Sequence, residues 1–219
     1  MNSFKKAILF DMDGVVLDSE KLYTKAEIKL FGEYGVEIPE EDWALFRGCS
    51  ENEFFDKSMN RYNIKEDRAV FMNKGREYVK GEFEKNLNYM PGFKGLHNMV
   101  IANYKTALVT ASPQHNLNWV RTIIDLDYYF ENILSGEETT KNKPHPEPYL
   151  EMMSRLNVKP SNTIIIEDSL NGIHAGLKSG AFVIAKTGSV PTNELSIAHK
   201  IVSSLNEINK NLIEELLQK

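Results

Sequence analysis

The chain has 219 residues and a formal net charge of −5, with 42% hydrophobic and 26% charged residues. This length allows one domain of moderate size, or a core with an inserted second lobe. The acidic balance argues against nucleic acid as a partner, because nucleic-acid binding usually needs a basic face. The single cysteine, Cys49, excludes a disulfide within the chain. With no apolar run long enough for a signal peptide or a membrane span, we expect a cytoplasmic protein that binds no membrane.

The first predicted element is a short buried strand over residues 7–10, which runs directly into two carboxylates. Asp11 and Asp13 follow it with one residue between them, and Gly14 allows the backbone to turn away. Ligands of an open parallel sheet bind outside the carboxyl ends of its strands. Two carboxylates so close repel each other unless a cation such as Mg²⁺ joins them. An Asp-x-Asp pair alone is equally compatible with a solvated strand end.

A helical segment is predicted after this strand. Asp18 or Ser19 would cap its first helix, and the pattern stays helical to about residue 86, with a loop over 47–50 and a break near Asn63. Since no strand pattern occurs between residues 19 and 86, we expect an inserted helical cap over residues 17–87. The core would then consist of residues 1–16 and 88–219.

Strands and helices alternate in the rest of the chain. The predicted strands cover residues 106–110, 133–135, 163–166, 182–185 and 201–202. The helix after the first of these would have Ser112 as its N-cap and Pro113 at its first position. This alternation predicts an α/β fold with a Rossmann-like parallel sheet, in which all the strands end at one edge.

Polar residues of different kinds follow the strands at this edge. They are Asp11 and Asp13, then Thr110 and Ser112, then Lys143 in a proline-rich loop, and finally Glu167 and Asp168. Acidic groups for a metal, a hydroxyl and a lysine suit phosphoryl transfer, which depends on charge neutralisation and positioning more than on unusual chemistry.

These residues resemble the motifs of the haloacid dehalogenase superfamily, and within it those of the β-phosphoglucomutase-like phosphatases. Four motifs match in order: Asp11-Met12-Asp13-Gly14-Val15, the strand ending at Thr110, Lys143-Pro144, and Glu167-Asp168. The helical segment takes the position of the family's cap. The resemblance therefore covers nearly the whole chain, and four motifs in the right order are far more specific than any one of them.

The resemblance implies chemical roles for four of these residues. Asp11 would be the nucleophile that forms an aspartyl-phosphate. Asp13 would protonate the leaving oxygen and then take a proton from the hydrolytic water. Thr110 would hydrogen-bond a phosphoryl oxygen, and Lys143 would neutralise charge between Asp11 and the phosphate.

The resemblance also implies a metal ion and a set of substrate contacts. Mg²⁺ would be held by the carboxylates of Asp11 and Asp168 and by the backbone carbonyl of Asp13. Glu167 would act as a ligand either directly or through water. The substrate contacts implied by the family are Gly14, Arg47, Gly48, Ser50, Ala111 and Ser112.

Two departures from the β-phosphoglucomutases bear on the reaction. Tyr23 stands where their first cap helix has a histidine, and Glu51 stands where their cap loop has an arginine for the second phosphate. A mutase must hold a bisphosphate and turn it around, so these departures favour a phosphatase. We expect a monomeric Mg²⁺-dependent enzyme that hydrolyses a small phosphomonoester such as a sugar phosphate. The alternatives are a phosphomutase on the same chemistry and a non-catalytic sugar-phosphate-binding protein.

Overall fold

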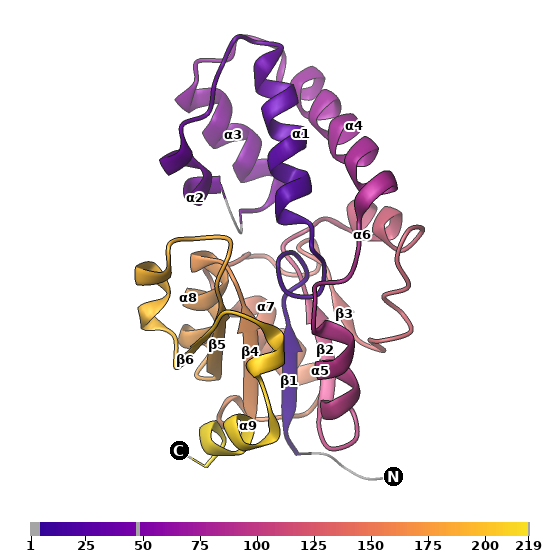
Figure 1. Cartoon of the computed structure of the whole chain (residues 1–219), viewed down its shortest axis with the longest axis vertical. Helices are drawn as coiled ribbons and strands as arrows, with labels where there is room; N and C mark the ends of the chain where they lie inside the picture. The colour runs from indigo at the N-terminus through magenta and orange to yellow at the C-terminus, as the bar shows by residue number, and fades with distance from the viewer. Residues whose placement is uncertain (1–4, 47–48, 219) are drawn as a thin grey trace.

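The computed structural model describes residues 5–46 and 49–218 of the chain (Figure 1). In these residues six strands form one parallel sheet with the order β3-β2-β1-β4-β5-β6. The strands are β1 (Ala7–Phe10), β2 (Lys105–Val109), β3 (Ile133–Leu134), β4 (Thr163–Glu167), β5 (Phe182–Lys186) and β6 (Lys200–Val202). The predicted α/β class with a Rossmann-like parallel sheet is therefore confirmed.

Strand β1 lies between β2 and β4 in the middle of the sheet, and its sequence explains this position. All four of its residues are fully buried. Because successive side chains of a strand point to opposite faces, Ile8 and Phe10 pack into the core on one side of the sheet, and Ala7 and Leu9 into the core on the other. An unbroken apolar run is what a parallel strand needs when helices cover both faces.

Helices cover both faces of the sheet. The core around Phe10 includes α5 (Phe93–Val100), α6 (Gln114–Val120) and α9 (Lys210–Leu216). The core around Leu9 includes α7 (Glu147–Arg155) and α8 (Leu170–Lys178). Short 3-10 turns at Pro160–Asn162, Thr192–Ile197 and Leu205–Glu207 complete this half of the molecule. Among all the helices that the structure describes, none combines the length and the apolar character needed to cross a membrane.

A helical lobe stands over one edge of the sheet (Figure 1). It consists of α1 (Glu20–Gly32), a 3-10 turn (Glu40–Asp42), α2 (Trp43–Phe46), α3 (Glu51–Arg61) and α4 (Arg68–Asn86). The lobe has a core of its own, built around Leu30, Phe31, Phe55 and Phe71. The inserted helical part of the predicted fold is thus present, while its exact limits at residues 17 and 87 stay a prediction.

Two serines were candidates for helix caps. Ser19, the alternative to Asp18, occupies the N-cap position of α1, but its side chain makes no capping hydrogen bond. Helix α6 begins at Gln114 with Pro113 at its N-cap position, so the prediction that Ser112 caps this helix was wrong. The Ser19 hydroxyl instead donates to Asp13 Oδ1 at 2.6 Å. This hydrogen bond is charge-assisted, so the carboxylate is a strong acceptor for the hydroxyl hydrogen.

Candidate active site

The edge of the sheet under the helical lobe gathers most of the predicted site residues into one cleft of about 330 Å³. The strand order reverses at β1, and ligands of such sheets bind at this reversal, outside the carboxyl ends of the strands. From the core, the cleft is lined by Asp11, Asp13, Thr110, Ala111, Ser112, Lys143, Asp168 and Ser169. Residues as far apart in the sequence as Asp11 and Ser169 therefore meet at one place, because parallel strands all end at the same edge.

Lys143 lies at the centre of a buried network of charges. Its Nζ donates to Asp11 Oδ1 at 2.5 Å, to Glu167 Oε1 at 2.7 Å and to the backbone carbonyl of Val109 at 3.0 Å. Burial alone would lower the pKa of Lys143, but the charges of Asp11 and Glu167 outweigh it and the pKa is raised. The ammonium group therefore stays charged and fixed beside Asp11.

Three buried acids crowd together at the same point. Asp11, Glu167 and Asp168 each place one carboxylate oxygen within 4.8 Å of the others. Burial, and after it the charge of Glu167, raises the pKa of Asp11 well above its ordinary value. Burial, followed by the charges of Glu20 and Asp11, likewise raises the pKa of Asp168 well above its ordinary value. Crowded oxygen donors with raised pKa values fit a hard divalent cation such as Mg²⁺, which relieves their repulsion.

Glu167 has a different environment from the other two acids. It is fully buried and does not line the cleft. Its Oε1 accepts from Lys143 and from the Tyr149 hydroxyl at 2.6 Å, while its Oε2 accepts from the backbone N–H of Asp168 and the hydroxyl of Ser169, both at 3.1 Å. A carboxylate has about four lone-pair sites, and these donors occupy them. Glu167 is therefore held toward Lys143 and Tyr149 rather than toward the cleft.

Asp13 is the second carboxylate of the first motif. Its Oδ1 accepts from Ser19 Oγ at 2.6 Å. Burial raises the pKa of Asp13 to about 6, against the lowering effect of Ser19. A carboxyl group with such a pKa can give and take a proton near neutral pH. Gly14 follows with a φ of +72°, and a side chain there would collide with the Asp168 carboxylate, so the glycine lets the two motifs approach.

Thr110 directly follows β2 and lines the cleft. Its side-chain oxygen accepts from the backbone N–H of Ser112 at 3.0 Å, and only 2% of the residue is exposed. The hydroxyl hydrogen is therefore left to donate to a group bound in the cleft, beside Asp11 and Lys143.

The arrangement matches a known family of enzymes. The model of the haloacid dehalogenase-like hydrolase family matches residues 8–186. The chain belongs to this family. It is 32% identical over 176 residues to the phosphorylated carbohydrates phosphatase of Thermotoga maritima, which covers 80% of this chain and 82% of that protein. It is 28% identical over 217 residues to hexitol phosphatase B of Escherichia coli O157:H7, covering 92% of this chain and 93% of that one.

Solved structures give the same result. The β-phosphoglucomutase of Clostridium difficile superposes with a TM-score of 0.83 at 26% identity, and the match covers 97% of each chain. These likenesses confirm the predicted membership of the haloacid dehalogenase superfamily and of its β-phosphoglucomutase-like branch. They also confirm that the chain is an enzyme of a hydrolase class.

The substrate contacts implied by the haloacid dehalogenase-like motifs are only partly gathered in the cleft. Ala111 and Ser112 line it. Gly14 lies against the Asp168 carboxylate, and Ser50 is the N-cap of α3 in a capping box with Glu53. Neither residue is among those that line the cleft, and their roles as substrate contacts stay predictions. Arg47 and Gly48 lie outside the described residues.

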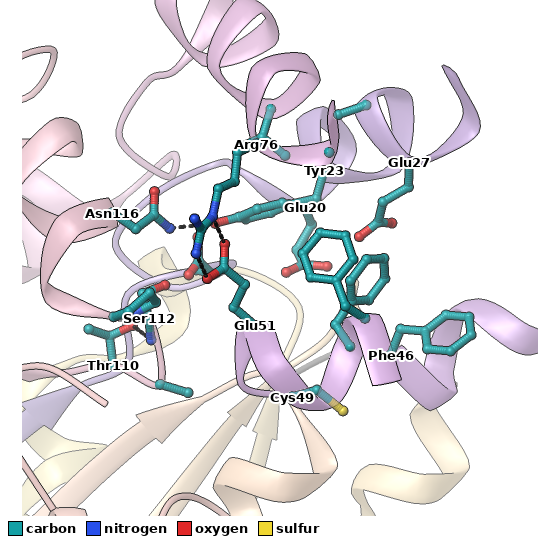
Figure 2. A pocket seen from close by; sticks show the side chains of 18 of the residues that line it. Glu20, Tyr23, Glu27, Phe46, Cys49, Glu51, Arg76, Thr110, Ser112 and Asn116 are labelled. Atoms are coloured by element: carbon teal, nitrogen blue, oxygen red, sulfur yellow. Dashed lines mark hydrogen bonds and ion pairs between the residues drawn. The ribbon is translucent and has the colours of Figure 1, made fainter. Parts of the chain in front are cut away.

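The structure of this haloacid dehalogenase-like hydrolase also has polar contacts that its sequence did not predict, and Figure 2 shows two of them. In the lobe, Arg76 binds Glu51 through two hydrogen bonds. Asn116 of α6 donates to the Tyr23 hydroxyl at 3.4 Å. Deeper in the core, Ser189 donates to the Asp168 carboxylate and Tyr149 to Glu167. These residues lie in helices or loops without a local motif, so their partners are known only once the elements pack together.

Proposed function

We propose that the chain is a Mg²⁺-dependent phosphatase that hydrolyses small phosphomonoesters, sugar phosphates above all, through an aspartyl-phosphate intermediate. The observation that carries this proposal is the meeting of Asp11 with Lys143, Asp168 and a second acid, Asp13, at the foot of one cleft. A phosphatase named for phosphorylated carbohydrates and another named for hexitols are among the relatives, which supports the substrate class.

The residues of the cleft suit two successive displacements at phosphorus. In the first, an oxygen of Asp11 bonds to phosphorus while the bond to the alcohol oxygen breaks, and Asp13 gives its proton to that oxygen. In the second, Asp13 takes a proton from a water molecule whose oxygen bonds to phosphorus, and the bond to Asp11 breaks. Phosphate leaves and both carboxyl groups return to their starting states.

The charge of the phosphoryl group has to be balanced throughout both steps. Lys143 is held beside Asp11 by three hydrogen bonds and places a permanent positive charge there. Thr110 would donate to a phosphoryl oxygen. Mg²⁺ would supply the remaining neutralisation, held by the carboxylates of Asp11 and Asp168 and the backbone carbonyl of Asp13, with Glu167 acting through its contacts with Lys143 rather than as a direct ligand.

We also propose a division of labour between two domains, with residues 1–16 and 88–219 as the catalytic core and residues 17–87 as the lobe that selects the substrate. The lobe supplies the wall of the cleft that faces the acids, including Tyr23, Glu51 and Arg76. Its position over the phosphate-binding groups leaves the alcohol part of the substrate to contact the lobe.

A phosphomutase is the second candidate, supported by the structural likeness to a β-phosphoglucomutase. The same two aspartates would serve it, but the enzyme would have to bind a second phosphate in the lobe. Glu51 lies in this wall and is paired with Arg76, which favours release of the phosphate to water.

Product analysis tests the proposal. Sugar phosphates including β-glucose 1-phosphate would be incubated with the protein and Mg²⁺, and again after chelation of the metal. We expect inorganic phosphate from the native protein with Mg²⁺, and a loss of more than about 10⁴-fold in kcat for Asp11→Asn. Glucose 6-phosphate with little free phosphate would establish the mutase. A lack of any product that depends on Asp11 would leave a binding protein.

A further inference from the structure

The wall of the cleft that faces the catalytic acids contains one bidentate ion pair. Arg76 of α4 donates from Nε to Glu51 Oε1 at 2.7 Å and from Nη2 to Glu51 Oε2 at 2.6 Å. Figure 2 shows the two side chains reaching toward each other, with Thr110 and Ser112 of the core lining the same pocket. The pair therefore lies where the part of the substrate beyond its phosphate has to fit.

This pairing leaves Arg76 poorly suited to bind a second anion. Both oxygens of Glu51 and the Nε–Nη2 edge of the guanidinium group are engaged in one planar contact, which is the geometry that an arginine would otherwise offer to a phosphate or carboxylate. An anionic group could bind Arg76 only through its remaining N–H groups or by displacing Glu51. In either case the anion would lie beside the Glu51 carboxylate, and like charges placed side by side repel each other.

The other polar groups of this wall suit hydroxyl groups. Glu20, Glu27 and Glu77 line the same cavity as Glu51, and the cations of the described part of the lobe that line it are Arg76 and Lys80, so carboxylates outnumber cations in this wall. Asn116 and Tyr23 offer an amide and a phenol, and burial raises the pKa of Tyr23 well above its ordinary value, so the phenol stays neutral. A hydroxyl both donates and accepts, which matches alternating carboxylate, amide and guanidinium partners.

We propose that the alcohol released from the phosphate ester is an uncharged polyol, and that the Arg76–Glu51 pair excludes alcohols that carry a second anionic group. This inference rests on the proposed function and adds the substrate's charge to it. It applies to sugars and sugar alcohols alike, since the pair distinguishes a hydroxyl from a carboxylate or phosphate and not an open chain from a ring.

Two matched esters test the inference on the native protein. D-glucitol 6-phosphate and 6-phosphogluconate have the same carbon chain and the same phosphate position, but one ends in a hydroxymethyl group and the other in a carboxylate. With Mg²⁺ present, we expect kcat/KM for phosphate release to favour D-glucitol 6-phosphate by about tenfold or more. A value equal to or higher for 6-phosphogluconate would overturn the inference while leaving the proposed function in place.

A second pair of esters tests the sign of the charge. Glucosamine 6-phosphate differs from glucose 6-phosphate by an ammonium group in place of a hydroxyl. If the acidic side chains selected a cation, the amino sugar would be the faster substrate, and the uncharged polyol would be the wrong class. We expect glucose 6-phosphate to be hydrolysed at least as fast.

Glu51→Gln links the preference to the pair itself. The variant frees the charge of Arg76, so we expect the preference for D-glucitol 6-phosphate to fall by about tenfold. Asp56→Asn is the matched control, because Asp56 pairs with Arg68 across the same two helices at 2.6 Å but does not line this cleft. It should keep the native preference. An unchanged preference in a folded Glu51→Gln protein would contradict the inference.

Binding gives the same answer if Glu51→Gln fails to fold. Calorimetry with Asp11→Asn and Mg²⁺ should show tighter binding of D-glucitol 6-phosphate than of 6-phosphogluconate, and the reverse order would refute the inference. If the native protein released phosphate from none of the four esters, the proposed function would fail and this inference with it.

Discussion

Two ion-pair systems face each other across the cleft, and they differ in their contact with water. The Lys143 side chain is 2% exposed and its partner Asp11 12%, whereas the side chains of Arg76 and Glu51 are 37% and 22% exposed. A buried charge that loses its partner destabilises the fold strongly, while a partly solvated one loses little. The residues that we propose for the reaction therefore depend on one another for stability, whereas either member of the Arg76–Glu51 pair can be replaced with little loss of stability.

The largest effect is expected when the buried ion-pair network loses its cation, Lys143. Lys143→Met leaves Asp11 and Glu167 together without a cation, and we expect a loss of about 3–5 kcal/mol in the free energy of unfolding. Urea denaturation at neutral pH without Mg²⁺ measures it. Lys141→Met, an exposed lysine two residues earlier, is the control and should stay within about 0.5 kcal/mol of the native protein. Equal stability of the two variants would contradict the buried network.

A smaller change to the same network sharpens the comparison. Tyr149→Phe removes only the hydroxyl that donates to Glu167, and with it the contact that holds Glu167 against Lys143. We expect the Mg²⁺ concentration for half-maximal thermal stabilisation to rise by about tenfold or more, because groups behind the metal ligands orient them. The native fold should remain. Tyr128→Phe, at an exposed tyrosine, should leave the Mg²⁺ dependence unchanged.

His97 extends the comparison to a group far from the cleft. It is 2% exposed among Phe10, Phe93 and Phe130, and burial lowers its pKa below the ordinary 6.5. The unfolded chain therefore binds the proton more tightly than the folded one. Stability is fully present above pH 6.5 and falls as the pH drops below it. Between neutral and mildly acidic pH, the free energy of unfolding of His97→Leu should fall less than that of the native protein, as urea denaturation at each pH would show. Equal losses would exclude His97 as a cause of the pH dependence.

The smallest effect is expected at the exposed edge of the lobe. Asp56→Asn breaks an ion pair whose side chains are 40% and 57% exposed. We expect the free energy of unfolding to change by less than about 1 kcal/mol, since exposed pairs are screened and mobile. Urea denaturation at low and high salt checks this. A loss comparable to that of Lys143→Met would remove the distinction between the two systems.

The sequence predicted the chemical half of the site better than the selective half. Asp11, Thr110 and Asp168 each directly follow a strand, and Lys143 lies in the loop after β3, so the rule that parallel strands end at one edge predicts that they lie close together. No comparable rule exists for the lobe. Glu51 and Arg76 lie 25 positions apart on different helices, and charged residues on helices are usually solvated. Only the packing of α3 against α4 shows that they meet.

The same contrast explains the errors. Asp18 or Ser19 was predicted as one helix cap and Ser112 as another, because local patterns record only neighbours in the sequence. Ser19 does occupy an N-cap position, but its hydroxyl donates to Asp13, which lies in the turn after β1. Tyr149 gave no signal at all, since an aromatic residue in an amphipathic helix predicts only burial. Its hydroxyl donates to Glu167, and these two residues come together only when helix α7 packs on the sheet.

The chain passes between core and lobe twice, near residues 16–18 and near residues 88–90, and these two segments are hydrogen-bonded to each other. The backbone N–H of Met90 donates to Val16 at 2.8 Å, and that of Asp18 donates to Asn88 at 3.0 Å. The outgoing and returning chains are thus hydrogen-bonded into one two-chain ribbon between the core and the lobe. Ser19 follows directly on this ribbon and holds Asp13. Any tilt of the lobe would therefore also act, through Ser19, on Asp13, the group that we propose as the proton donor.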